Sequence, residues 1–248
     1  NQTTITNGTS SSSNNSNGNS GAVYIYKRTG TSWAQEAYIK ASNNDENDYF
    51  GNSAALDDDT LAVGADTEDS NQTTITNGTS SSSDNTRLGS GAVYVYKRTG
   101  TSWAQEAYIK SSNNDNGANG YSDSFGFRIA LDNETLAVGA YGEDSNQTTI
   151  TNGTSASSDN SEQDSGAVYV YKRTGSSWAQ EAYLKTSNSD DHELVGYRVA
   201  LDGDTLAVTA RTESSNQTTI TNGTSSSTNK SNHYAGAVFV YKRTGSSW

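Results

Sequence analysis

The stretch GAVYIYKRTGTSWAQEAYIK, residues 21–40, opens with apolar and aromatic side chains that alternate with a period of two. Val23 and Ile25 would point to one side of the chain, and Tyr24 and Tyr26 to the other. A period of two predicts a β-strand. Because both of its sides are apolar or aromatic, we expect both faces of this strand to be covered.

The Thr-Gly pair that follows is typical of a turn, and the segment after it predicts a second, antiparallel strand. In this second strand Trp33, Ala37 and Ile39 are expected to share one face, and Glu36 and Lys40 the other. One face is therefore expected to be wetter, as in a strand farther from the core.

The whole chain repeats this pattern. The glycine before Ala-Val recurs as Gly21, Gly91, Gly166 and Gly236, and the tryptophan of the hairpin recurs as Trp33, Trp103, Trp178 and Trp248. The sequence thus divides into units 1–70, 71–145 and 146–215, and a partial unit 216–248 in the same phase as residues 1–33. Self-similarity at such a period indicates a repeat architecture.

Each unit continues with a segment of the type FGNSAALD, a tight turn, and a segment of the type TLAVGA. Small residues such as Ala62, Gly64 and Ala65 let a backbone approach its neighbours closely, which suggests a crowded position near the axis of a radial assembly. Each unit therefore supplies about four antiparallel strands. This predicts an all-β fold of tandem, four-stranded, propeller-like blades.

These motifs resemble the FG-GAP repeat family, the blade type of the integrin α-subunit head. Phe50-Gly51 and Phe125-Gly126 stand at the FG motif, and residues 61–65 and 136–140, both LAVGA, stand at the GAP motif. The likeness covers the whole chain and is especially marked toward large, exported bacterial FG-GAP proteins. The third unit departs from the pattern, with Val195-Gly196 in place of FG.

Many members of that family carry a calcium loop between the FG and GAP strands. Here the corresponding loop is cut to LDDDT, LDNET or LDGDT. A calcium ion takes six or more oxygen ligands, and a two-residue turn with two carboxylates cannot supply them alone. We therefore assign no metal or cofactor site, and keep as an alternative a weaker calcium site that also uses the DTED or GED loops.

Three and a half units cannot close a ring of equal blades, since propellers have about 4–8 of them. We expect the blades to be completed by neighbouring repeats of the same protein or by self-association, because open strand edges invite pairing. Repeated head-to-tail contacts would form a filament. The chain begins with Asn and contains no Met, so we expect it to be a piece of a longer precursor.

The composition excludes several classes of function. With a net charge of −12, the chain lacks the basic clusters that bind nucleic acid. No stretch approaches the roughly 20 apolar residues of a membrane-spanning helix. There is no Cys, and the two histidines, His192 and His233, lie in non-equivalent loops. A Ser-His-Asp constellation has no support, so we do not expect an enzyme.

The octapeptide NQTTITNG occurs in all four units and has one apolar residue, so core packing does not explain it. It is either a solvated loop copied with each unit, or a strip that bears sugar or makes contacts. Its NQT and NGT triplets match the N-glycosylation pattern. The candidate glycosylation sites are Asn1, Asn7, Asn71, Asn77, Asn146, Asn152, Asn216 and Asn222.

The YKRTG segments hold half of the basic residues. They are interpreted as hairpin tips whose charges pair with nearby carboxylates, with a row of cationic sites as the alternative. The tyrosines of the GAVYVY segments are expected to pack between blades. Trp33 and its equivalents are better candidates for exposed contacts, although packing is expected for them too.

These observations lead us to expect an extracellular or cell-surface protein with a structural or adhesive role. Its repeated polar surface would act through many weak contacts, and it could assemble into a filament. Glycans and surface proteins are further candidate partners. The alternative is a glycan- or protein-binding propeller module within a large secreted protein.

Overall fold

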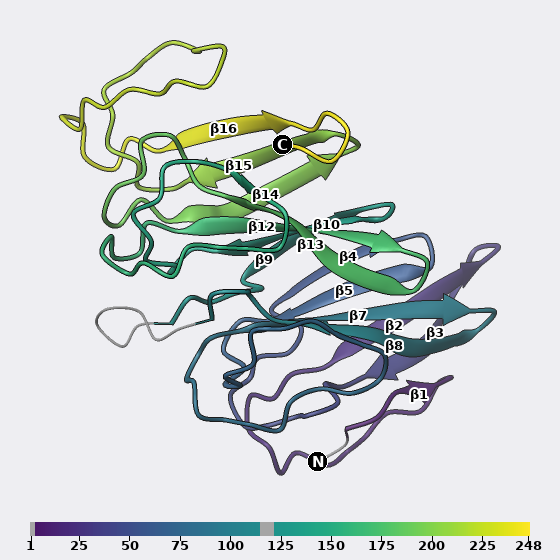
Figure 1. The fold of residues 1–248 in the computed structure, drawn as a ribbon. Coiled ribbons are helices and arrows are strands. Elements are labelled where there is room, and N and C mark those ends of the chain that lie inside the picture. The colour runs from purple at the N-terminus through teal and green to yellow at the C-terminus, as the bar shows by residue number, and fades with distance from the viewer. Residues whose placement is uncertain (1–2, 115–121) are drawn as a thin grey trace.

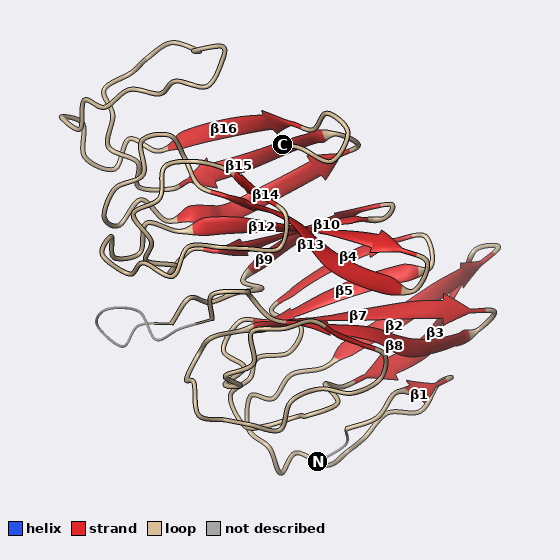
Figure 2. Ribbon diagram, in the orientation of Figure 1, coloured by secondary structure: helices blue, strands red, loops and turns tan. Residues whose placement is uncertain are grey.

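The computed structural model describes residues 3–114 and 122–248, and within these ranges it consists of strands, turns and loops (Figures 1 and 2). Every paired strand is antiparallel to its neighbours. The described residues contain no helix long and apolar enough to cross a membrane. The predicted all-β fold is confirmed.

The strands fall into five repeating types. Two types form the outer hairpin: the GAVYVY strands β2 (Val23–Thr29), β7 (Ala92–Thr99), β12 (Ala167–Thr174) and β16 (Ala237–Lys242), and the strands β3 (Ser32–Ile39), β8 (Ser102–Ile109) and β13 (Ser177–Leu184). Two types form the inner hairpin: β4 (Ser53–Asp57), β9 (Arg128–Asp132) and β14 (Val195–Asp202), followed by β5 (Thr60–Ala65), β10 (Thr135–Ala140) and β15 (Thr205–Ala210). The fifth type is the short strand β1 (Thr6–Asn7), β6 (Thr76–Asn77) or β11 (Thr151–Asn152).

Each central sheet joins two consecutive units of the sequence. One sheet has the order β4-β5-β7-β8-β6, and the next has the corresponding order β9-β10-β12-β13-β11. The inner hairpin of one unit therefore pairs with the outer hairpin of the following unit. The unit boundaries after residues 70 and 145 mark the sequence repeat, but the blades cross them.

The sheets stack in sequence order, with the three-stranded sheets β1-β3-β2 and β14-β15-β16 at opposite ends (Figure 1). The described part of the chain therefore forms an open stack. The innermost strands are β4, β9 and β14, which contact one another from blade to blade. The TLAVGA strands β5 and β10 are buried throughout, as predicted for a crowded place, but they lie one position out from the inner edge.

A β-bulge makes one expectation about the outer hairpin wrong. Ile25 pairs with Ala37, whereas the next residue, Tyr26, pairs with Gln35, so Glu36 is an extra residue in its strand. An extra residue reverses the alternation of side chains beyond it. Trp33 consequently lies on the face of Tyr26, opposite Ala37 and Ile39. The same bulge recurs in the β7–β8 and β12–β13 pairs.

The core lies between successive sheets. The tyrosines of β7 belong to a cluster with Ile25, Ile39 and other residues of the first sheet, whereas the valines of β7 belong to a cluster with residues of the third sheet. Each GAVYVY strand thus turns its tyrosines toward the preceding blade and its valines toward the following one. In β7 and β12 both faces are covered, and their tyrosines are confirmed as core between blades. In β2 the expectation is wrong, because no described blade covers Tyr24 and Tyr26, which are 47% and 56% exposed.

Consecutive inner strands approach so closely that one position of the TLAVGA strand must be glycine. A Cβ atom on Gly64 would lie 2.1 Å from the backbone oxygen of Gly126, and one on Gly139 would lie 2.2 Å from that of Gly196. Backbone atoms cannot give way cheaply at such distances. The equivalent residue of the last sheet is Thr209, and the described chain places no further blade against it.

We predict that Gly139→Ala destabilises the protein by at least about 1–3 kcal/mol, because the methyl group forces two blades apart. Thr209→Ala is the control. It removes one exposed hydrogen bond, which Thr209 Oγ1 accepts from the backbone N–H of Arg198 (2.9 Å), and should change stability by less than about 1 kcal/mol. Urea unfolding of both variants measures the difference. Equal stabilities would contradict the close approach of β10 and β14.

Candidate functional site

Each junction between blades is fastened by the asparagine that ends the short first strand. Asn7 Oδ1 accepts a hydrogen bond from the backbone N–H of Trp103 (2.8 Å), and Asn7 Nδ2 donates to the backbone oxygen of the same residue (3.5 Å). Asn77 grips Trp178 in the same way, at 2.7 and 3.3 Å. Asn152 accepts from the backbone N–H of Trp248 (2.9 Å).

The bulged glutamate completes this latch. Glu36 Oε2 accepts hydrogen bonds from Trp103 Nε1 (3.1 Å) and from Arg98 Nη1 (3.3 Å), both on the following blade. The backbone N–H of Gly8 donates to the Glu36 carbonyl (2.6 Å), which pins the bulge. We call this set, Asn7 and Glu36 with Arg98 and Trp103, the junction latch. It recurs with Glu106 on Arg173 and Trp178, and with Glu181 on Arg243 and Trp248.

Three of the four arginines of the YKRTG segments, Arg98, Arg173 and Arg243, are therefore parts of the latch. Arg98 also pairs with Asp59 in the inner hairpin of its own blade, and hydrogen bonds to Asp59 and Glu36 raise its pKa above the usual value. Its guanidinium lies over the Trp103 ring, 5.6 Å from the centroid. Pairing with carboxylates is confirmed, but the pairs lie at a partly buried junction rather than at a hairpin tip in water.

The latch shows where the structure places the candidate glycosylation sites. Asn7, Asn77 and Asn152 all use their side-chain amides in junction contacts. The side chains of Asn71, Asn146, Asn216 and Asn222 are exposed, and Asn1 lies outside the described residues. The octapeptide thus has a structural task, because its Asn-Gly pair holds the bulge and the next blade. Sequence reasoning missed this, although the Asn and the Glu recur in phase in the full units.

We predict that Asn77→Ala destabilises the protein by about 1–3 kcal/mol, since it leaves the Trp178 backbone groups unpaired at a partly buried junction. Asn222 occupies the same place in the octapeptide, but in the described residues its side chain holds no tryptophan of another blade, so Asn222→Ala should change stability by less than about 0.5 kcal/mol. Chemical denaturation of both variants tests this difference. Equal losses would show that the latch contributes nothing specific.

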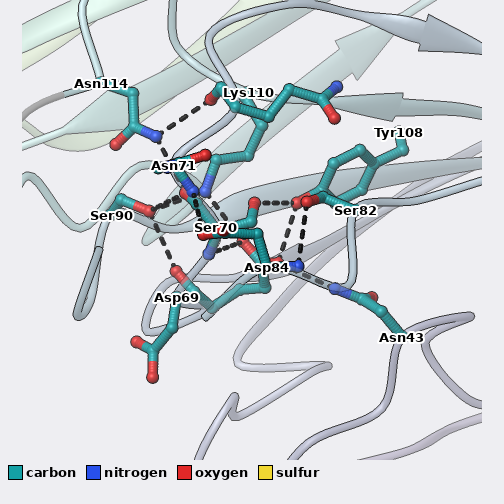
Figure 3. Close-up of polar contacts among 12 residues, drawn as sticks. Asn43, Asp69, Ser70, Asn71, Ser82, Asp84, Ser90, Tyr108, Lys110 and Asn114 are labelled. Carbon is teal, nitrogen blue, oxygen red and sulfur yellow. Dashed lines mark hydrogen bonds and ion pairs between the residues drawn. The ribbon is translucent and has the colours of Figure 1, made fainter. Parts of the chain in front are cut away.

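A buried polar centre lies at the end of β8, where Lys110 follows the strand (Figure 3). Glu68, which follows strand β5, accepts from Lys110 Nζ (2.8 Å) through Oε2, and from Tyr108 Oη and Asn43 Nδ2 (both 2.8 Å) through Oε1. Ser70 donates its hydroxyl to the same carboxylate (3.0 Å). The Lys110 and Glu68 side chains are 0% and 1% exposed, so this is a fully buried ion pair.

The centre is repeated at the following junctions with small changes. Glu143 accepts from Lys185 Nζ (2.9 Å), Tyr183 Oη (2.8 Å) and Asn113 Nδ2 (2.8 Å). In the last sheet Glu213 accepts from Asn188 (2.8 Å), and Lys230 approaches it from the loop before β16. Similar geometry in consecutive junctions indicates a role in the fold.

Burial dominates the electrostatics of these centres. It lowers the pKa of Lys110 and of Lys185 by disfavouring the ammonium form, and the neighbouring glutamates act against that shift. Near the last sheet, burial raises the pKa of Glu193 to about 7, although Lys230 lies in ion-pair contact and opposes the shift. Paired and hydrogen-bonded in this way, the buried charges are held rather than free to react.

The polar centre anchors the loop that begins with the octapeptide. Asn114 Nδ2 donates to the backbone oxygens of Ser70 and Gln72, both at 2.9 Å, and Ser90 Oγ donates to that of Ser70. Lys110 Nζ donates in turn to Ser90 (2.7 Å). The carboxylate of the DTED loop therefore holds a lysine ammonium. Among residues 3–114 and 122–248, no group of three or more His, Asp or Glu side chains is placed to hold a metal ion.

We predict that Lys110→Met destabilises the protein by about 3–5 kcal/mol, because it leaves the Glu68 charge buried without its partner. The double variant Lys110→Met/Glu68→Met should be more stable than Lys110→Met, since removing both charges removes the desolvation cost. Lys242→Met, at an exposed position, is the control. Unfolding free energies of these variants give the coupling, and additive losses would argue against a paired centre.

Comparison with protein families gives one match. The model described as the FG-GAP repeat matches residues 33–96 and 103–171, which together make up more than half of the chain. The chain belongs to the FG-GAP repeat family. Both matched segments run from the second strand of an outer hairpin (β3 or β8) through the inner hairpin to the next GAVYVY strand, so each crosses a boundary between sequence units. A search of curated proteins returns no match to the chain.

The shortened turn of this FG-GAP chain serves the contact between blades. Asp57 Oδ2 accepts from the backbone N–H of Asn133 (2.6 Å), and Asp132 Oδ2 accepts from that of Gly203 (2.5 Å). Each turn thus caps the turn of the following blade. The carboxylates at the place of the family's calcium loop hold backbone N–H groups in this chain.

Proposed function

We propose that this FG-GAP chain is a structural or adhesive module of the cell exterior whose end faces pack against neighbouring repeats of the same protein or against further copies of it. FG-GAP repeats are typical of extracellular proteins, and a propeller-type repeat module suits protein interactions. The observation that carries the proposal is that the two ends of the stack present the two halves of one interface. Each half lacks the partner that it has at the internal junctions.

The N-terminal sheet presents the half that normally faces a preceding blade. Tyr26 and Trp33 are 56% and 67% exposed there. Their equivalents at the next junction, Tyr96 and Trp103, are 1% and 3% exposed. Burying such aromatic area is the main favourable term in association.

The C-terminal sheet presents the opposite half. Val238 and Val240 of β16 are 63% and 67% exposed, whereas Val93 and Val95 of β7 are fully buried against the following blade. A second copy placed head to tail would lay these valines on Tyr24 and Tyr26, as β7 lies on β12. The interface is heterologous, so repeated association gives a filament or a closed ring according to the rotation between copies.

The adhesive role would come from the octapeptide loop, which is repeated in every unit. A chain of such modules presents the exposed octapeptide loop, with Asn71, Asn146 and Asn216, at every unit. Several weak contacts then act together, and their avidity exceeds that of one site. We propose Asn71, Asn146, Asn216 and Asn222 as the glycan carriers, because they lie outside the latch, whereas the side-chain amides of Asn7, Asn77 and Asn152 bind the next blade.

We predict that the 248-residue chain associates as its concentration rises, with a mass that grows beyond a dimer. Tyr26→Asp and Val240→Asp should each abolish this growth, because each places a charge in one half of the interface. A mixture of the two variants should form dimers and stop there, since each retains the half that the other lacks. Sedimentation equilibrium and electron microscopy measure these outcomes.

Leu88→Asp is the matched control, because Leu88 is 73% exposed in a lateral loop and adds the same charge away from both ends. It should associate like the unchanged chain. A chain that remains monomeric at millimolar concentration would overturn the proposal and favour the alternative, a glycan- or protein-binding module that acts as a single copy.

A further inference from the structure

Three aromatic rings and three arginines gather at the inner edge of the third and fourth sheets. They come from the start of β9, the residue after β10, the first part of β14 and the residue after β15. The six residues are Phe127, Arg128, Tyr141, Tyr197, Arg198 and Arg211. We call them the arginine–aromatic cluster.

The rings form a triangle of mutual contacts. The Phe127 centroid lies 4.6 Å from that of Tyr141 and 5.3 Å from that of Tyr197, and the two tyrosine centroids are 5.9 Å apart. All three side chains are partly exposed. Rings that already hold one another in place lose little freedom when a ligand packs on them.

The guanidinium groups lie over this platform. Arg128 sits 4.1 Å from the centroid of Phe127, and Arg198 and Arg211 sit 4.9 and 4.7 Å from that of Tyr197. In the described ranges none of the three lies within ion-pair distance of a carboxylate, in contrast to the latch arginines. Burial and then the nearby charge of Arg198 lower the pKa of Arg128, so the two cations repel each other.

The repeat itself does not require this cluster. The first unit carries Asn52, Ser53 and Asp66 at the positions of Phe127, Arg128 and Tyr141. There Asn52 donates to Asp66 (2.9 Å), and Ser53 donates to the Gly126 carbonyl (2.7 Å), with the same backbone arrangement. The fold is thus built without aromatic or cationic side chains at these positions. A cluster confined to two adjacent blades differs from the repeated contacts of the latch.

We propose that the arginine–aromatic cluster binds an acidic saccharide. A guanidinium fork pairs with a carboxylate or sulfate group through two parallel hydrogen bonds. The three rings, tilted by 47–69° to one another, place partly exposed apolar carbons beside the guanidinium groups, where the C–H groups of a sugar can pack. An anion bound beside Arg198, which is exposed, would also offset the repulsion between Arg198 and Arg128. The net charge of −12 disfavours a long nucleic acid as the ligand.

The test is isothermal titration calorimetry of the 248-residue chain with trigalacturonate, a sulfated disaccharide, inorganic sulfate, neutral maltotriose and an oligothymidylate. Binding of the carboxylated or the sulfated sugar is expected, and comparing the two identifies the anionic group. Arg198→Gln and Arg211→Gln should each weaken that binding about tenfold, as expected for one lost charge-assisted contact. Tyr197→Ala should weaken it as well.

Arg28→Gln is the matched control, since it removes the same charge from an exposed position on the first sheet and should leave binding unchanged. Thermal unfolding shows whether each variant is folded. Absence of binding by either acidic sugar would overturn the proposal. So would equal binding of inorganic sulfate, equal loss in Arg28→Gln, or stronger binding of the oligothymidylate. Arg198 lies in the same cross-strand row as Thr209 and Val238 of the C-terminal end face. Repeating the titration with Val240→Asp, which should not associate through that face, therefore separates ligand binding from end-to-end association.

Discussion

The packing of one sheet on the next is the contact on which every other feature of this molecule depends. A single blade has tyrosines on one face and valines on the other, and it can bury both only between two neighbours. That arrangement requires inner strands to approach until Gly64 meets the backbone of Gly126, with no room for a side chain. As in other repeat proteins, stability therefore resides in the interfaces between neighbours rather than within one unit. Each end blade of the described chain has only one neighbour, so one of its faces stays uncovered.

Polar groups fix how the sheets meet, because apolar faces alone would allow sliding. In the latch, Asn7 hydrogen-bonds the backbone of the next blade, and the bulge places Glu36 beside Trp103 and Arg98 of that blade. At the other end of β8, the buried Lys110–Glu68 pair ties the octapeptide loop to the hairpin. Buried ion pairs add little net stability against apolar replacements, but breaking one is costly, so they penalise wrong arrangements. The repeated lysine, glutamate and asparagine thus specify register.

Residues that recur in each unit build the fold, whereas the residues proposed to bind a ligand do not recur in the first unit. Side chains that recur in phase form the core, the latch and the polar centre, and they explain the family membership. Phe127, Arg128, Tyr197 and Arg198 do not recur in the first unit, and they gather on two adjacent blades. Repetition supports the proposed structural role because it gives the two ends of the stack complementary faces. The departure from repetition supports a ligand site, since the fold persists without these side chains.

The sequence alone determined the strand types, the unit boundaries and the family resemblance, because period-two alternation and exact repetition are local signals. It also indicated that Gly64 lies in a crowded strand. Only the tertiary structure decided that blades straddle the units, since pairing between distant strands leaves no mark in either segment. The bulge at Glu36 likewise arises from cross-strand pairing, and it reversed the predicted face of Trp33. The arginine–aromatic cluster emerged only when strands 70 residues apart in sequence were brought to one edge, as with Arg128 and Arg198.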